Sequence, residues 1–131
     1  MMCGSASCGI MPFGGATFRA PAQLGWGNAM RFLLTGEEFG AAEAVRIGLV
    51  QEVVPAGAHL QRATDLAHLI ARQAPLGVQA TLASARAGLG RGPDAGRDAI
   101  VSLLPGIMHS QDAAEGLRSF IERREANFAG Q

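Results

Sequence analysis

Lysine is absent from the sequence, so all eleven basic residues are arginines, and eleven acidic residues balance them to a formal net charge of zero. A protein that binds a phosphate backbone or an anionic bilayer needs an excess of positive charge to neutralise those surfaces. The balanced charge therefore argues against nucleic acid and membrane surfaces as partners.

Cysteine is scarce as well, with only Cys3 and Cys8, both in a Gly/Ser-rich opening stretch. Two thiols so close together describe neither a disulfide framework nor a four-ligand zinc site. The three histidines, His59, His68 and His109, have no spacing that suits a metal. We therefore expect neither a metal site nor a bound cofactor.

Long apolar runs are also missing, since none approaches the roughly 20 residues that a membrane-spanning helix requires. The stretch from Met1 to Met11 lacks the basic segment that begins a signal peptide. These absences predict a cytoplasmic protein.

Apolar residues are plentiful, at 48% hydrophobic against 17% charged, which is more apolar than an average soluble domain. A chain of 131 residues is long enough for a single domain with its own core. The apolar excess fits an oligomer or a piece of a larger fold with apolar faces left over.

The first part of the chain combines turns, helices and one strand. A Gly/Pro-rich loop is predicted for residues 9–17, followed by a helix with Pro21 in its first turn and its end at Gly36. A short helix over residues 41–47 precedes residues 49–54, whose β-branched side chains and following proline predict a strand.

The remainder is predicted to be helical from apolar residues at three- and four-residue steps. Pro105 and Gly106 are expected to split one of these helices, because proline removes a backbone donor. Another begins with Ser110 as its N-cap and Asp112 in its positive first turn. The predicted ranges are 57–74, 75–89, 93–110 and 110–128.

Several of these segments, in this order and spacing, resemble the enoyl-CoA hydratase/isomerase (crotonase) family. GIMPFGGAT at 9–17, LLTG at 33–36 and AAEAVRIGLVQEVVP at 41–55 are similar to the family's G-x-x-P loop, L-T-G and A-x-E-A-x-x-x-G-L-V with its following strand. SQDAAEGLRSFIERREANF at 110–128 resembles the family's closing helix. The resemblance covers nearly the whole chain, and it is to the family's C-terminal half only.

The resemblance implies an α/β fold, a spiral of strand-strand-helix turns followed by a helical region that packs trimers. The chain is expected to form the mostly helical C-terminal half of that spiral, with one clear strand. Residues 1–8 are interpreted as an unmatched leader, 9–56 as the end of the crotonase-like core, and 57–131 as the helical trimerisation region. A homo-oligomer, a trimer or a dimer of trimers, is expected.

For activity, the resemblance implies acyl-CoA thioester substrates, two backbone amides that stabilise the thioester enolate, and two glutamates that handle water and proton. The first amide belongs to the family's N-terminal half. The second amide and one glutamate belong to a stretch before Met1, and the other glutamate position falls on Ser5. We therefore expect a truncated chain with no catalytic residue. Glu37, Glu38 and Glu43 are interpreted as stabilising helix ends rather than as substitute bases.

Phe120 and Arg123 match positions at which the family's last helix offers an aromatic and a basic residue to the adenosine part of coenzyme A bound to a neighbouring subunit. The alternative is a core phenylalanine and a solvated arginine, since residues three apart share one side of any helix. Two functions also stay open: a family enzyme of fatty acid metabolism, hydratase (a lyase) or isomerase, and a non-catalytic module that oligomerises or contacts coenzyme A.

Overall fold

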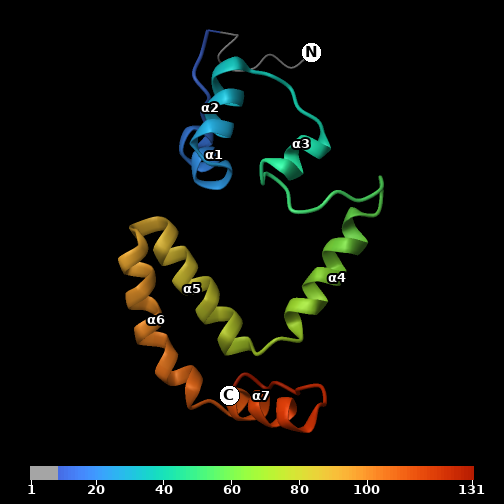
Figure 1. The fold of residues 1–131 in the computed structure, drawn as a ribbon, viewed down its shortest axis with the longest axis vertical. Coiled ribbons are helices and arrows are strands. Elements are labelled where there is room, and N and C mark those ends of the chain that lie inside the picture. The colour runs from blue at the N-terminus through green and yellow to red at the C-terminus, as the bar shows by residue number, and fades with distance from the viewer. Residues whose placement is uncertain (1–8) are drawn as a thin grey trace. The chain divides into compact units, whose positions relative to one another are not determined.

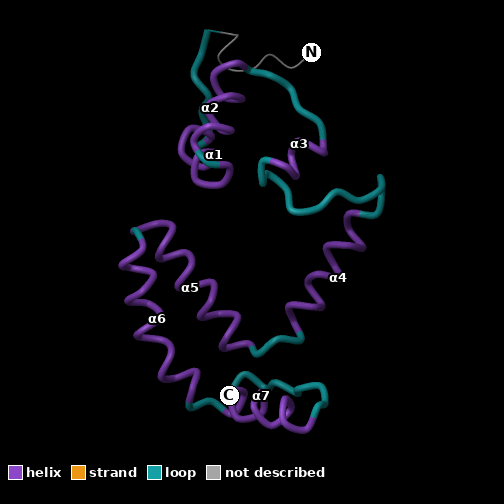
Figure 2. Tube along the Cα trace, viewed as in Figure 1, coloured by secondary structure: helices purple, strands orange, loops and turns teal. Residues whose placement is uncertain are grey.

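The computed structural model describes residues 9–131, so the predicted leader at 1–8 lies outside the described residues. The described part is mostly helical, as predicted, and holds helices and loops without a strand (Figures 1 and 2). The chain divides into two compact units, with the boundary after Ala56. The helices are α1 (Ala16–Leu24), α2 (Trp26–Thr35), α3 (Ala41–Arg46), α4 (His59–Ala71), α5 (Pro75–Arg91), α6 (Pro93–Met108) and α7 (Gln111–Glu122).

In the first unit, α1 and α2 pack against each other and α3 follows. The predicted end of α2 is confirmed, because Gly36 adopts the left-handed conformation (φ 67°) and donates its amide hydrogen to Phe32 O at 2.9 Å. The predicted helix start was wrong. α1 begins at Ala16, so Pro21 lies inside it and costs the helix one backbone hydrogen bond.

The predicted strand at residues 49–54 was also wrong, since this segment is a loop. The amides of Leu49 and Val50 donate to Ala44 O at the end of α3, at 2.9 and 3.3 Å, which wraps the chain around that helix. Gln23 Nε2 donates to Leu49 O at 3.1 Å. A strand needs a neighbour to complete its ladder, and the described part of the chain offers none.

In the second unit, α5 and α6 form an antiparallel hairpin (Figure 1). The two helices approach most closely at Gly88 and Gly96. A Cβ atom on Gly96 would lie 3.1 Å from Gly88 Cα and 3.3 Å from Ser84 O. The backbones therefore meet where neither helix carries a side chain.

The break predicted at Pro105 and Gly106 does not occur, and α6 is continuous through both residues. Pro105 lies in the last turn of α6, so its missing amide removes a single hydrogen bond close to an end where helices already leave groups unpaired. Leu103, Leu104 and Ile107 line a groove against α5 around this position. This packing supports the helix across the proline.

α7 starts as predicted, because Ser110 Oγ accepts a hydrogen bond from the Ala113 amide at 3.0 Å. It ends at Glu122 rather than running on to Phe128. The Arg123 amide donates to Phe120 O at 3.4 Å and the Arg124 amide to Ser119 O at 3.1 Å. These two bonds form a Schellman turn.

Few side chains are buried within the described residues, and many large apolar ones are exposed. Ala29, Ala44 and Ile47 are buried in the first unit, whereas Leu89 and Phe120 in the second are each 82% exposed. The chain therefore presents apolar helix faces to its surroundings. No helix in the described residues is both long enough and apolar enough to cross a bilayer.

Candidate functional site

The structure places Phe120 and Arg123 together at the C-terminal end of α7. Phe120 lies in the last turn and is 82% exposed, so it does not belong to a core of this chain. Arg123 follows the helix as its C-cap and is also exposed. An aromatic ring and a guanidinium group are thus both accessible at one helix end, and their ligand-binding role stays a prediction.

The backbone at Arg123 is unusual. Its φ of 54° makes it the one non-glycine residue in the described part of the chain with a left-handed conformation. For a residue with a Cβ atom this conformation costs roughly 1–2 kcal/mol, because the Cβ crowds the following carbonyl. Strained non-glycine residues are concentrated at functional sites, where the surrounding structure holds them in place.

The next residue, Arg124, ties this turn back to α7. Its guanidinium contacts Glu115, with Nη1–Oε1 at 2.5 Å and Nη2–Oε2 at 2.9 Å, and its Nε lies 2.6 Å from Glu122 Oε2. Glu115 also accepts a hydrogen bond from the Asn127 amide at 3.0 Å. The hydrogen bonds from Arg124 and Asn127 lower the pKa of Glu115 to about 2, so its carboxylate stays charged at neutral pH.

Asp112, one turn before Glu115, is only 3% exposed and holds the end of the described chain. Its Oδ1 accepts from the Ala129 amide at 2.7 Å and its Oδ2 from the Gly130 amide at 2.9 Å. The sequence predicted Asp112 only as a first-turn acid and did not show this role. The available signal was the spacing of Asp112 and Glu115, which places two carboxylates on one side of the helix.

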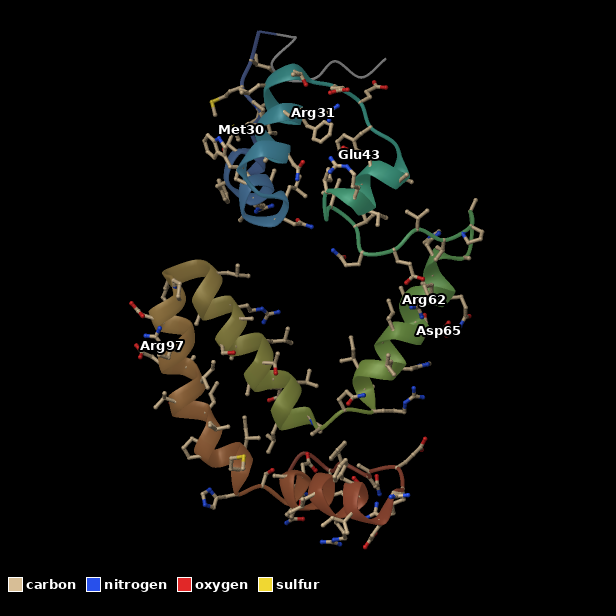
Figure 3. The ribbon with its side chains drawn as sticks, viewed as in Figure 1. Met30, Arg31, Glu43, Arg62, Asp65 and Arg97 are labelled. Carbon is tan, nitrogen blue, oxygen red and sulfur yellow. The ribbon has the colours of Figure 1, made fainter. Side chains whose placement is uncertain are left out.

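Two of the three glutamates considered as substitute bases, Glu37 and Glu43, are held by arginines, whereas Glu38 is an exposed loop residue. Arg31 on α2 contacts Glu37 through Nε and Nη2, both at 3.0 Å, and Arg46 contacts Glu43 through Nε and Nη2, both at 2.6 Å. Glu43 lies in the first turn of α3, as predicted (Figure 3). The hydrogen bond from Arg46 lowers the pKa of Glu43. A carboxylate with a lowered pKa is a weaker proton acceptor.

The histidines are spread along the helices of the second unit. His59 begins α4, His68 lies in its last turn, and His109 follows α6 with Nδ1 2.7 Å from Pro105 O. Within the described residues, no three histidine, cysteine, aspartate or glutamate side chains form a group that could hold a metal.

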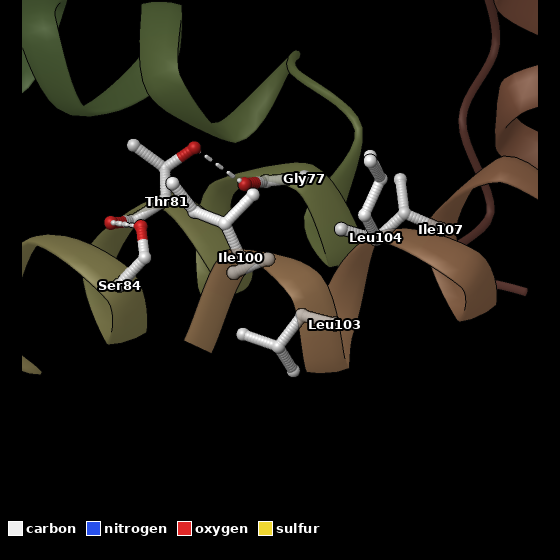
Figure 4. Close-up of a pocket in the computed structure, with 8 residues that line it drawn as sticks. Gly77, Thr81, Ser84, Ile100, Leu103, Leu104 and Ile107 are labelled. Atoms are coloured by element: carbon white, nitrogen blue, oxygen red, sulfur yellow. Dashed lines mark hydrogen bonds between the residues drawn. The ribbon is translucent and has the colours of Figure 1, made fainter. Parts of the chain in front are cut away.

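Apolar cavities flank α5. One, of about 310 Å³, lies between α5 and α6, with Thr81 and Ser84 on one side and Ile100 and Leu103 on the other (Figure 4). Thr81 Oγ1 donates to Gly77 O at 2.8 Å, so this hydroxyl is already paired within its helix. A second cavity, of about 520 Å³, is lined by Ile70, Gln73, Ala74, Gly77, Val78, Thr81, Leu82 and Phe128. Both are suited to apolar contacts.

Comparison with known proteins relates the chain to acyl-CoA enzymes. It is 33% identical over 130 residues to carnitinyl-CoA dehydratase of Proteus mirabilis and 37% identical over 123 residues to enoyl-CoA hydratase EchA19 of Mycobacterium tuberculosis. These alignments cover 96% and 94% of this chain but only 50% and 46% of the relatives. The chain thus spans about half the length of the curated relatives it matches.

Solved structures show the same relation. A probable enoyl-CoA hydratase/isomerase from Mycobacterium abscessus matches with a TM-score of 0.86 and 49% identity, over 97% of this chain and 49% of that one. An enoyl-CoA hydratase from Bacillus anthracis matches with a TM-score of 0.87 and 30% identity, over 98% of this chain and 50% of that one. The family model described as enoyl-CoA hydratase/isomerase matches residues 2–131. The chain therefore belongs to the enoyl-CoA hydratase/isomerase family.

Proposed function

We propose that the chain works on acyl-CoA thioesters as the helical, coenzyme A-contacting part of an enoyl-CoA hydratase/isomerase assembly in the cytoplasm. The observation that carries the proposal is the family match across residues 2–131. The names of the relatives support the substrate class, since carnitinyl-CoA and enoyl-CoA are both acyl-CoA thioesters.

The end of α7 supplies chemistry that fits the nucleotide part of coenzyme A. An exposed aromatic ring such as Phe120 offers a face on which adenine can stack, and the guanidinium of Arg123 can pair with phosphate oxygens in a bidentate manner. Because both side chains are exposed on this chain, we propose that a second chain completes the pocket. Affinity for the isolated chain should therefore be weak.

Calorimetric titration with coenzyme A tests this role. Phe120→Ala and Arg123→Ala should each abolish the weak binding of the unaltered chain. Leu89→Ala is a matched control for the ring, because Leu89 is equally exposed at 82%. Arg118→Ala is the control for charge, because Arg118 is an exposed arginine of the same helix. Binding that is indifferent to both Phe120→Ala and Arg123→Ala would return these residues to a purely structural role.

We further propose that the 131-residue chain alone does not hydrate crotonyl-CoA above background. A positioned acid or base typically increases the catalysed rate by about 10²- to 10⁴-fold, and one oxyanion donor increases it by about 10²- to 10³-fold. Glu37 and Glu43 are both engaged by arginines, which supports excluding them as substitute bases. The assay is loss of the conjugated enoyl thioester absorbance. Turnover that survives repurification and disappears on Glu37→Gln, Glu38→Gln or Glu43→Gln would refute the proposal.

A second candidate function is a non-catalytic oligomerisation module. It is favoured by the exposed apolar residues on α5, α6 and α7, among them Leu89, Val101 and Ile121. The two candidate functions differ in whether the chain binds coenzyme A. The first predicts binding of coenzyme A that depends on Phe120, whereas the second predicts self-association without nucleotide binding.

A further inference from the structure

Residues 124–131, here called the strap, fold back along α7 and are held there by two carboxylates of that helix. Asp112 accepts the Ala129 and Gly130 amides, and Glu115 accepts the Asn127 amide together with the Arg124 guanidinium. In the reverse direction the Asp112 amide donates to Gln131 O at 3.1 Å. The strap has no secondary structure of its own, so these bonds are its main polar attachment.

Both carboxylates are shielded from solvent and accept hydrogen bonds from the strap. Asp112 is 3% exposed and uses both oxygens on strap amides, and the Glu115 side chain is 16% exposed and uses both oxygens on Arg124. Hydrogen bonds to a charged acceptor are roughly twice as strong as neutral ones. Removing either charge would deprive strap donors of their charged acceptor in a partly buried place, and an amide in its position would keep one accepting oxygen.

The strap connects α7 with α5. Phe128 lies against Gly116 of α7, where an added Cβ would be 3.7 Å from Phe128 Cε1, and Phe128 also lines the larger apolar cavity beside Val78. Gly130 lies against the first residue of α5, with an added Cβ 3.5 Å from Pro75 Cγ. The strap therefore contacts both helices, and its Phe128 lines part of that cavity.

We propose that Asp112 and Glu115 are positioning residues, a latch that holds the strap on α7 and thereby fixes the Schellman turn that presents Phe120 and Arg123. The connection is covalent and short, because Arg124, which Glu115 holds, directly follows the strained Arg123. The consequence for coenzyme A rests on the proposed function, whereas the latch itself does not.

Amide hydrogen exchange on the 131-residue chain tests the latch directly. In Asp112→Asn the Ala129 and Gly130 amides should exchange roughly 10-fold faster or more, and in Glu115→Gln the Asn127 amide should do so, because each loses a charged acceptor. Ser110→Ala is the matched control. It removes the N-cap of the same helix and should speed exchange at Ala113 while leaving the strap amides unchanged.

Coenzyme A titration of the same variants separates positioning from mere support. With far-UV circular dichroism unchanged, both latch variants should weaken coenzyme A binding several-fold although Phe120 and Arg123 are intact, and Ser110→Ala should not. If Asp112→Asn loses helix, the Glu115→Gln variant decides, because the Glu115 side chain is less deeply buried than Asp112. Unchanged exchange at the strap amides in both variants would overturn the latch. Faster exchange in a protein that binds no coenzyme A at all would support the latch and overturn the proposed function instead.

Discussion

Arg123 adopts a left-handed backbone conformation that favours glycine. Replacing Arg123 with glycine relieves the left-handed strain, so we expect Arg123→Gly to stabilise the chain by about 1 kcal/mol. The same substitution removes the guanidinium and should reduce coenzyme A affinity. Gains in stability at the expense of function are typical of strained functional positions.

Thermal unfolding followed by circular dichroism measures this effect, with Arg118→Gly as the matched control. Arg118 lies inside α7, where glycine costs about 1 kcal/mol, so the two Arg-to-Gly variants should change stability in opposite directions. A destabilised Arg123→Gly would mean that contacts of the side chain outweigh the strain.

Single residues were predicted best where their role is local. Ser110 as an N-cap and Gly36 as a helix stop depend on bonds within four residues, and both predictions are confirmed. The role of Asp112 depends on amides 17 and 18 residues away, which meet it only after the strap folds back. Phe120 shares its exposure with Leu117 and Ile121 of α7, so it belongs to an apolar helix face that the chain leaves uncovered.

At the scale of elements, the contact between α5 and α6 gives a sharp test. Gly96→Ala places a Cβ 3.1–3.3 Å from backbone atoms of α5, which cannot move as a flexible side chain can. Overpacking of this kind typically costs about 1–3 kcal/mol, which exceeds the gain of up to about 1 kcal/mol from replacing a helical glycine. We therefore expect Gly96→Ala to be destabilising in urea or thermal unfolding.

Gly90→Ala is the control within the same hairpin. Nothing lies within 4 Å of a Cβ atom built at Gly90, so this variant should show the helix-propensity gain alone. If both variants stabilise the chain, the result would contradict the close contact between the backbones of α5 and α6 at Gly88 and Gly96.

Whole elements were mispredicted where packing overrides local preference. The β-branched run at residues 49–54 has the composition of a strand, but a strand forms only against a partner, and within the described residues the run caps α3 instead. Pro105 followed by Gly106 predicts a helix break. The helix stays continuous because Pro105 lies in the last turn of α6 and because the neighbouring side chains pack against α5. The local sequence pattern does not reveal whether a strand will find a pairing partner or which element will pack against a helix.

At the scale of the molecule, the exposed apolar residues predict self-association at micromolar concentration, because large exposed apolar patches usually mark interfaces. Light scattering measures it. Val101→Glu introduces a charge at an apolar α6 position that is 67% exposed, and it should shift the chain toward monomer. Gln79→Glu adds the same charge on α5 without removing apolar surface and should not. A monomeric unaltered chain with a cooperative melt would contradict the prediction.

The loop at residues 49–54 has a consequence for handling the protein. Its sequence, LVQEVV, combines β-branched and aliphatic residues without proline or glycine, which is the composition that stacks into cross-β fibrils when such segments meet. Glu52 carries the only formal charge in this window, and a charge inside such a window acts as a gatekeeper against stacking. The solubility of the chain during expression should therefore depend on this one glutamate, and neutralising it should promote amyloid-like precipitation.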